Sequence, residues 1–300
     1  MIVLGFDTAT PATAVALRLA DGTTLRARDD PQPGARPGHT TRLLPLASEL
    51  LAQAALRWSS LQRIAVGVGP GTFTGLRIGV ATARALAQSL GVDVVAVGTP
   101  RVLAEAALRE FEPAVSELRV LSVIDARRGE AFAAAYAPAE DPADAQAEDP
   151  ADAQADDPAD VQADDPADAQ ADDPADVQAD DPADASADGP VGDSDDPRSP
   201  ARAREIAPAC ALAPERFAAL VAELGADRDW LAVGDGAVRF RAQLEAVGVA
   251  VAADSSALHR VDAGVLCELA LVAPRGAPEA VLPDYRRRPD AEIALENAKQ

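Results

Sequence analysis

The sequence contains 300 residues, of which 25% are charged, and its formal net charge is −22. The excess negative charge lies in one segment, because residues 140–196 include many acidic residues and no basic one. Outside this segment acidic and basic residues are equal in number, so the net charge excludes no class of partner for the rest of the chain.

The apolar residues are not arranged as in a membrane protein or an exported protein. No apolar run reaches the roughly 18 residues that indicate a transmembrane helix, and the segment MIVLGFDTAT lacks the basic start and cleavage site of a signal peptide. Cys210 and Cys267 stand alone, so we interpret them as buried free thiols rather than as metal ligands or a disulfide. These features predict a cytoplasmic protein.

The first part of the chain predicts a hairpin, a third strand and a helix. Residues 2–6 and 13–19 are apolar runs on either side of a Thr/Pro turn, and a strand over 24–28 follows the Asp21-Gly22 turn. A helix is predicted over 40–57, with Thr40 as its N-cap. Its apolar residues form two stripes, Leu43, Leu46, Leu50 and Ala54 in one and Leu44, Leu51 and Ala55 in the other. A helix with two apolar stripes has two surfaces to cover.

A glycine-rich segment, GVGPGTFTGLRIG at 67–79, joins a predicted strand at 64–68 to a predicted helix at 76–90, and another strand is predicted at 92–97. The segment does not match a P-loop, because Gly75 is followed by Leu76 and Arg77 instead of lysine and a hydroxyl residue. Its alternating glycines do not match a dinucleotide fingerprint either. We favour glycines that permit tight strand-to-helix packing. An anion held at the helix N-terminus by Thr72 and Thr74 stays the alternative.

The second part of the chain begins like the first. Strands are predicted at 119–125 and 130–136, and further elements follow in alternation: a helix at 214–224, a strand at 230–234, a helix from 237, a strand at 249–251 and a helix at 259–271. A strand and hairpin followed by alternating helices and strands, present twice, predicts a duplicated α/β fold of the actin and Hsp70 ATPase type, with two mixed-sheet subdomains.

The acidic segment is an insertion after the second hairpin. Residues 141–188 are six copies of an eight-residue repeat, each with a proline and almost no large apolar side chain. Such a segment cannot offset its ordering entropy, so we predict a disordered insert over 138–203. A solvated expansion in a surface loop is favoured over a regulatory acidic arm.

The residues that could carry chemistry are few. Asp7 ends the first predicted strand, where actin-like ATPases place a magnesium-associated carboxylate, and Asp125 has the corresponding position in the second half; either could simply begin a turn. His39 and His259 have no paired spacing that would indicate a metal site. His39 is interpreted as a helix-start residue in preference to a catalytic base. No G-x-S-x-G nucleophile elbow is present.

The segment DYRRRPDAE at 284–292 places Arg286, Arg287 and Arg288 together. Docking to the protein body, or plain solubility, is the favoured interpretation. Contact with an RNA phosphate is the alternative.

Five segments occur in the order typical of the TsaB (YeaZ) family, the dimerization subunit of the bacterial tRNA threonylcarbamoyladenosine machinery. They are FDTAT, GHTTRLLP, GVGPGTFTGLRIGVATARALA, IDARRGEAF and YRRRPDA. The chain resembles this family over 1–137 and more loosely over 204–292, with GPGTFTGLRIG as the most specific segment. The acidic repeat departs from the family pattern.

The resemblance implies a non-catalytic scaffold that binds TsaD, the paralogue that carries a metal-binding histidine pair and the nucleotide. In the family, the ATPase TsaE joins this heterodimer. The complex transfers a threonylcarbamoyl group from threonylcarbamoyl-adenylate to N6 of the adenosine beside the anticodon in tRNAs that read ANN codons. The resemblance also implies that this chain alone binds no cofactor, because ATP and metal belong to partner subunits. A homodimer in isolation is left open.

The resemblance also implies which residues have which role. The two helices of the first subdomain would form the partner interface, with candidate residues Leu44, Leu51, Ala55, Ile78, Ala81 and Ala85. A vestigial nucleotide site would contain Asp7, Thr8, Gly69, Gly71, Thr72, Thr74 and Gly75. Apart from the resemblance, Arg286, Arg287 and Arg288 stay the candidate RNA contacts, and neither a catalytic residue nor a metal ligand is expected.

The expected domains are an N-terminal actin-like subdomain over 1–103, which carries the partner interface, and a second actin-like subdomain over 104–137 and 204–300. The insert separates the two pieces of the second subdomain. The alternative function is an autonomous actin-fold ATPase or sugar kinase that uses Asp7 and the glycine-rich loop.

Overall fold

The computed structural model describes residues 1–32, 34–111, 118–139 and 202–286. The acidic repeat lies outside these residues, so its disorder stays a prediction.

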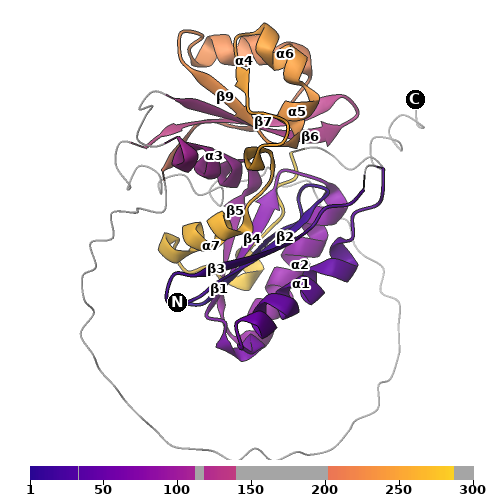
Figure 1. Cartoon of the computed structure of the whole chain (residues 1–300), viewed down its shortest axis with the longest axis vertical. Coiled ribbons are helices and arrows are strands. Elements are labelled where there is room, and N and C mark those ends of the chain that lie inside the picture. Colours follow the sequence, from indigo (N-terminus) through magenta and orange to yellow (C-terminus); the bar gives the residue numbers. More distant parts are fainter. Residues whose placement is uncertain (33, 112–117, 140–201, 287–300) are drawn as a thin grey trace, which may run out of the picture. The chain divides into compact units, whose positions relative to one another are not determined.

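Two five-stranded mixed sheets with the same topology form the frame of the fold (Figure 1). The first sheet has the order β3-β2-β1-β4-β5 and the second β8-β7-β6-β9-β10. The strands of the first sheet are β1 (Val3–Asp7), β2 (Thr13–Arg18), β3 (Thr24–Asp29), β4 (Arg63–Gly69) and β5 (Asp93–Gly98). Those of the second are β6 (Arg119–Arg127), β7 (Glu130–Pro138), β8 (Ala203–Leu212), β9 (Trp230–Val233) and β10 (Ala250–Val251).

The strand directions also match between the two sheets. The central strand β1 pairs antiparallel with β2 and parallel with β4, and β6 pairs in the same way with β7 and β9. The outer strands β5 and β10 are each parallel to their neighbour. The predicted duplicated α/β fold is therefore confirmed.

Helices cover both faces of the first sheet. On one face lie α1 (His39–Gln53) and α2 (Phe73–Leu90), and on the other lies α7 (Ala263–Val272), as Figure 1 shows. The helix α3 (Thr99–Glu110) contacts α7 and also strands of both sheets. The second sheet is covered by α4 (Phe217–Leu224), α5 (Asp235–Arg239) and α6 (Arg241–Ala246). Short 3-10 turns are η1 (Trp58–Ser60), η3 (Pro214–Arg216), η4 (Ala257–His259) and η5 (Pro278–Ala280).

Alternation along the strands divides the apolar side chains between separate cores. In β1, Leu4 and Phe6 join the cluster beneath α1 and α2, whereas Val3 joins the cluster that contains α3 and α7. Gly5, which lies on the same face of β1 as Val3, permits the close approach of α7. A Cβ atom at Gly5 would lie 2.7 Å from Sγ of Cys267, so a larger residue would push the helix away from the sheet.

The helix α1 differs from its prediction at both ends. It begins at His39 with Gly38 as N-cap, so Thr40 is not the cap. It ends at Gln53, before the predicted end at 57, because Ala55 adopts a left-handed conformation with φ of 55°. The amide of Leu56 then donates to the carbonyl of Leu51, which closes the helix in the manner of a Schellman motif without the usual glycine.

The second half contains elements that the sequence pattern missed or misplaced. The helix α3 and the strand β8 were not predicted, the helix predicted from 237 is two short helices, and the helix predicted from 259 begins at Ala263. The strand β8 contains Arg204, Glu205 and Pro208, and its pairing with β7 determines its conformation. Local pattern is a weak guide for such an edge strand.

The insert begins and ends within one hairpin. Pro138 pairs with Ala203 at the open end of the β7–β8 ladder, and the amide of Ala139 donates to the carbonyl of Arg202 at 2.7 Å. Glu105 of α3 holds the returning strand, because its Oε1 accepts hydrogen bonds from the amides of Arg202 and Ala203 at 2.8 and 2.9 Å. The β7–β8 ladder and Glu105 therefore hold the two ends of the insert beside each other.

Candidate functional site

Asp7 lies at the carboxyl end of β1 and is only 1% exposed. Its Oδ1 accepts a hydrogen bond from the amide of Ala9 at 2.8 Å, and its Oδ2 accepts one from the hydroxyl of Thr99 at 2.7 Å. Burial raises the pKa of the Asp7 carboxyl, and the two hydrogen bonds and Arg28 oppose this effect. Each oxygen of the Asp7 side chain thus has a hydrogen-bond donor within the fold.

The strand β4 closes the space beside Asp7. A Cβ atom at Gly67 would lie 1.8 Å from Oδ2 of Asp7, so any residue other than glycine would collide with the carboxylate. Sequence analysis did not single out Gly67 or Thr99. Gly67 stood in the glycine-rich segment and was detectable there, whereas nothing in the local sequence marks Thr99 as a partner of Asp7.

The glycine-rich segment packs directly onto the turn that follows Asp7. A Cβ atom at Gly71 would lie 2.4 Å from the carbonyl oxygen of Ala9, and one at Gly75 would lie 2.0 Å from that of Thr8. The amide of Thr72 donates to the same Ala9 carbonyl at 2.8 Å, and the hydroxyl of Thr8 donates to the carbonyl of Gly75 at 2.7 Å. We call residues 69–75, held in this way, the glycine elbow.

The remaining residues of the predicted nucleotide site have less direct roles. Gly69 adopts a φ of 102°, which only glycine tolerates readily. Thr72 is the N-cap of α2, but its side chain makes no capping hydrogen bond. Thr74 is exposed in the first turn of that helix. The close contacts of the glycine elbow favour the structural interpretation of the glycines, and a vestigial nucleotide site at these residues stays a prediction.

Asp125, the counterpart of Asp7 in the second half, has a different environment. Its carboxylate pairs with the Arg239 guanidinium at 2.6 Å and with that of Arg127 at 3.6 Å, and its amide donates to Oδ1 of Asp235 at 3.1 Å. Burial raises the pKa of Asp235, and the Asp125 charge adds to this effect. The two halves therefore share a backbone plan but differ in side-chain chemistry.

The two histidines are both used by the fold. His39, the first residue of α1, is 3% exposed; its Nδ1 lies 2.9 Å from the Thr13 hydroxyl, and burial lowers its pKa. His259 has its two ring nitrogens near the carbonyls of Gly234 and Ala252, at 2.9 and 3.0 Å. Within the described ranges, histidine, cysteine and acidic side chains form no group of three or more that could hold a metal ion.

Both cysteines are free thiols, but only Cys267 is buried as predicted, whereas Cys210 on β8 is partly exposed. Cys267 is buried in α7, and burial raises the pKa of its thiol to about 12, so it is not a reactive thiolate.

The predicted interface residues differ in exposure. On α1, Leu44 is 45% exposed, whereas Leu51 is 2% exposed and belongs to the core beneath the helix. Ala55 is exposed but lies beyond the end of α1. The second stripe is therefore not continuous, because the helix ends before it is complete. On α2, Ala81 and Ala85 are exposed and Ile78 is partly buried, so one small-residue face of this helix is open.

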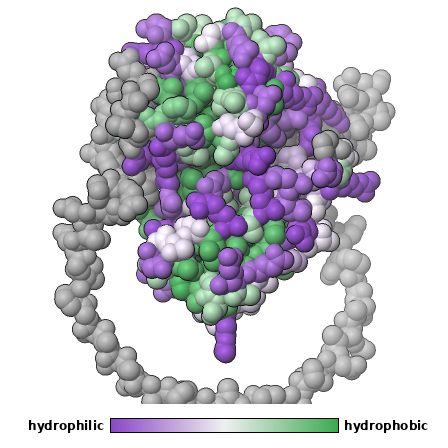
Figure 2. Space-filling model, viewed as in Figure 1, coloured by the Kyte–Doolittle hydropathy of each residue, from purple (hydrophilic) through white to green (hydrophobic). Residues whose placement is uncertain are grey.

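Apart from α1 and α2, exposed apolar side chains are spread over the surface of the described residues. Figure 2 shows hydrophobic side chains scattered among hydrophilic ones on the visible face of the described residues. Besides Leu44, the exposed large apolar residues in the described ranges are Met1, Phe111, Val272, Leu282 and Tyr285. Of the three C-terminal arginines, Arg286 is exposed and pairs with Asp284 at 2.7 Å. Arg287 and Arg288 lie outside the described residues.

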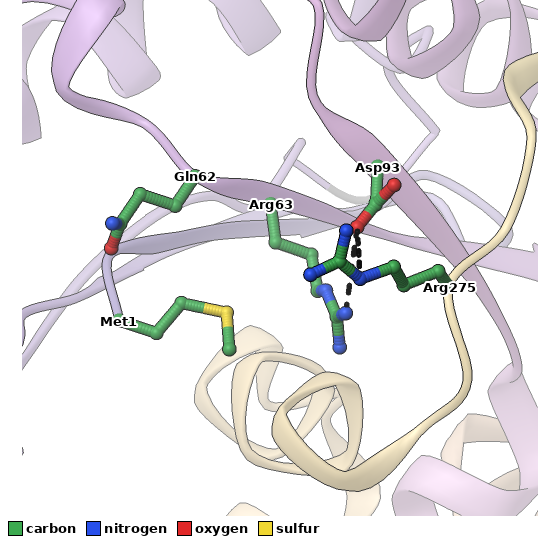
Figure 3. A pocket seen from close by; sticks show the side chains of 5 residues that line it. All are labelled: Met1, Gln62, Arg63, Asp93 and Arg275. Carbon is green, nitrogen blue, oxygen red and sulfur yellow. Dashed lines mark ion pairs between the residues drawn. The ribbon is translucent and has the colours of Figure 1, made fainter. Parts of the chain in front are cut away.

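A polar pocket lies at the end of the first sheet where β4 and β5 begin, opposite the end that carries Asp7 (Figure 3). It is lined by Met1, Gln62, Arg63, Asp93 and Arg275. Arg63 is 6% exposed and donates to the Ala270 and Ala273 carbonyls at the end of α7, while Asp93 lies 3.6 Å from Arg63 and 3.7 Å from Arg275. Arg63 therefore closes the C-terminus of a buried helix, and its charge is matched within the fold.

The internal role of Asp7 predicts a specific pH dependence. Its pKa is raised in the folded state, so Asp7 contributes stability below that raised pKa and loses this contribution as the pH rises through it. Asp7→Asn removes the ionisation, so the variant should gain stability relative to the wild type as the pH rises above 3.8, the ordinary pKa of the carboxyl. Urea unfolding across this range measures the effect, with the exposed Asp227→Asn as control. An unfolding free energy of Asp7→Asn that falls relative to the wild type as the pH rises would contradict the prediction.

Comparison with known proteins assigns relatives to this chain. Residues 33–178 match the family model described as TsaD, tRNA N6-adenosine threonylcarbamoyltransferase. The tRNA threonylcarbamoyladenosine biosynthesis protein TsaB of Escherichia coli K12 is 38% identical over 136 residues, which are 45% of this chain and 55% of the relative. The Haemophilus influenzae TsaB is 35% identical over 132 residues, 44% of this chain and 52% of the relative. The chain spans about half the length of these curated relatives.

A solved structure extends the similarity to nearly the whole chain. YeaZ from Pseudomonas aeruginosa matches with a TM-score of 0.60 and 26% identity, and the match covers 95% of this chain and 99% of that one. None of the helices in the described ranges is both long enough and apolar enough to span a membrane.

Proposed function

Since this chain belongs to the TsaB (YeaZ) family, we propose that it is the scaffold subunit that binds and supports TsaD. In this proposal TsaD transfers the threonylcarbamoyl group to N6 of the adenosine adjacent to the anticodon in ANN-decoding tRNAs. The present chain supplies no reactive group to that transfer.

The observation that carries the proposal is the internal use of Asp7. In an ATPase of this fold, the carboxylate at the end of the first strand faces a metal and its nucleotide. Here its oxygens accept hydrogen bonds from Ala9 and Thr99, and Gly67 lies against one of them. The glycine elbow packs against the same turn, where the hydroxyl of Thr8 donates to the carbonyl of Gly75. An ATPase or sugar-kinase activity centred on Asp7 would require these contacts to open.

The exposed faces of α1 and α2 support a partner surface on the first sheet. Leu44 is an exposed leucine on α1, and Ala81 and Ala85 form an exposed small-residue face on α2. Small side chains allow two helices to approach closely, so this face suits a helix of a partner with the same fold. In the absence of TsaD, a second copy of this chain is the other candidate occupant of the same surface.

The proposal also divides the chemistry between subunits. ATP and metal are held by partner subunits, TsaE joins the TsaD-bound assembly, and tRNA is bound through the complex. Arg286, Arg287 and Arg288 are candidate contacts to the RNA. The repeat carries strong negative charge and should be held away from the RNA phosphates.

Light scattering of a mixture with purified TsaD tests the proposal. We expect one species whose mass exceeds that of TsaD by the 30.8 kDa of this chain. Ala81→Arg should abolish this species, because a long charged side chain would be buried in the helix contact. Ala242→Arg, an equivalent exchange at an exposed position of α6, is the matched control and should leave it intact. Two separate proteins at micromolar concentration would contradict the proposal.

A further inference from the structure

The segment that follows α7 runs back to the glycine elbow. Residues 278–286, called the strap here, begin with η5, which contacts α2. Val281 is 3% exposed and belongs to the same core cluster as Val80 and Ala83 of α2. The strap is thus anchored to the helix by a buried side chain.

The strap then contacts the strand and helix on either side of the elbow. The amide of Asp284 donates to the carbonyl of Val68 at 2.8 Å, at the end of β4. The Tyr285 ring lies 4.9 Å from the Phe73 ring, centroid to centroid, and its hydroxyl accepts a hydrogen bond from Nε of Arg77 at 3.1 Å. The Arg77 guanidinium also lies over the Phe73 ring, 4.0 Å from its centroid.

These three side chains form a closed set, which we call the clasp: Phe73, Arg77 and Tyr285. Phe73 begins the first turn of α2 and Arg77 lies one turn later, whereas Tyr285 belongs to the strap, 208 positions away from Arg77 in the sequence. Each member touches both others, so loss of one weakens the remaining contact. The hydrogen bond, the ring contact and the cation–π contact together restrain the orientation of that first turn.

The clasp is continuous with the open face of α2. Arg77, Ala81 and Ala85 are spaced by four residues and are all exposed, so they lie along one face of the helix. Tyr285 is 42% exposed beside Arg77. A partner helix that covers Ala81 and Ala85 would therefore meet the clasp at the N-terminal end of the same face.

We propose that the strap fixes the first turn of α2 and forms the rim of the TsaD-binding surface, with Tyr285 and Arg77 as positioning residues. This inference rests on the proposed function for its partner, but the ordering of the elbow by the strap does not depend on any partner. An unclasped first turn would have to be ordered during binding, and this ordering lowers the affinity.

The test uses the full chain and two measurements. For Tyr285→Ala, we expect the dissociation constant for TsaD to rise about tenfold, the size typical for loss of an aromatic pair with its polar contact. Tyr285→Phe keeps the ring contact and should recover most of the affinity. Phe111→Ala, which removes an aromatic residue of similar exposure outside the strap, is the matched control and should not change it.

Hydrogen exchange of the isolated chain separates the strap from the partner. In Tyr285→Ala the amides of the elbow and of the first turn of α2 should exchange faster, while those of α7 should not change. Arg77→Ala, at an exposed position that the fold tolerates, should reproduce both effects, and the double variant should be no weaker in binding than the weaker single variant.

The outcomes distinguish the role of the strap from the proposed function. If the wild type binds TsaD and both single variants bind equally well with unchanged exchange, the inference is overturned and the proposed function stands. If the wild type does not bind TsaD, the proposed function fails, and unchanged exchange in Tyr285→Ala would overturn the role of the strap independently.

Discussion

Replacing Gly75 with alanine is expected to destabilise the protein by about 3 kcal/mol or more, at the upper end of the effects known for overpacked sites. The new methyl group would lie 2.0 Å from the carbonyl oxygen of Thr8 and 2.6 Å from the hydroxyl oxygen of Thr72. The first of these is a backbone atom of a buried turn, so it cannot move aside as a flexible side chain would. Relief requires α2 to move away from β1, which would also stretch the hydrogen bond from Thr8 to Gly75.

Urea unfolding at pH 7 measures this change, and Gly98→Ala provides the matched control. Gly98 has a φ of −62°, which alanine adopts without strain, and a Cβ atom there would lie 3.8 Å from its nearest neighbour. Gly98 is the N-cap of α3, where alanine is less favourable than glycine, so the control should change the unfolding free energy by about 1 kcal/mol or less. Equal stability of the two variants would show that the glycine elbow is not packed against the turn after Asp7.

Replacing Glu105 with alanine is expected to cost about 3 kcal/mol, because it leaves two backbone amides without their acceptor in a buried site. Glu105 is fully buried in α3, and its Oε1 holds the amides of Arg202 and Ala203 where the chain returns from the insert. Its other oxygen faces Arg109 at 3.7 Å. The variant would therefore release the start of β8 as well as create a cavity.

Glu105→Gln separates the hydrogen bonds from the charge. Its amide oxygen can still accept from both backbone amides, and burial raises the pKa of Glu105, so a neutral side chain suits this site. We expect Glu105→Gln to stay close to the wild type in urea unfolding and Glu110→Ala, at an exposed position of the same helix, to do so as well. A Gln variant as unstable as the Ala variant would assign the stabilisation to the charge instead.

Much of the first sheet could be predicted because its signals are local. The runs that became β1, β2 and β4 alternate or are continuously apolar, and turn residues separate them, so a short window contains the information. The repetition of this pattern after 119 indicated the duplication. The family resemblance then supplied a function that periodicity alone does not contain.

Other elements were missed because their conformation depends on distant partners. The strand β8 takes its extended form from pairing with β7 across the insert, and α3 lies among strands of both sheets. The end of α1 at Ala55 lacks the glycine that usually marks such a stop. Leu51 looked like part of an outer stripe, yet it follows the buried residues Leu43 and Ala47 at four-residue spacing and faces the core with them.

The sequence by itself determined the succession of strands along the first half of the chain, the glycine-rich connection after β4 and the acidic character of the insert, since each is encoded by neighbouring residues. Only the tertiary structure decided what the glycines and Asp7 do. The contacts between Thr8 and Gly75, 67 positions apart, and between Asp7 and Thr99, 92 positions apart, arise when β1, β4 and β5 align in one sheet. A carboxylate at a strand end is open to a ligand or enclosed by its neighbours according to which side chains that alignment brings beside it.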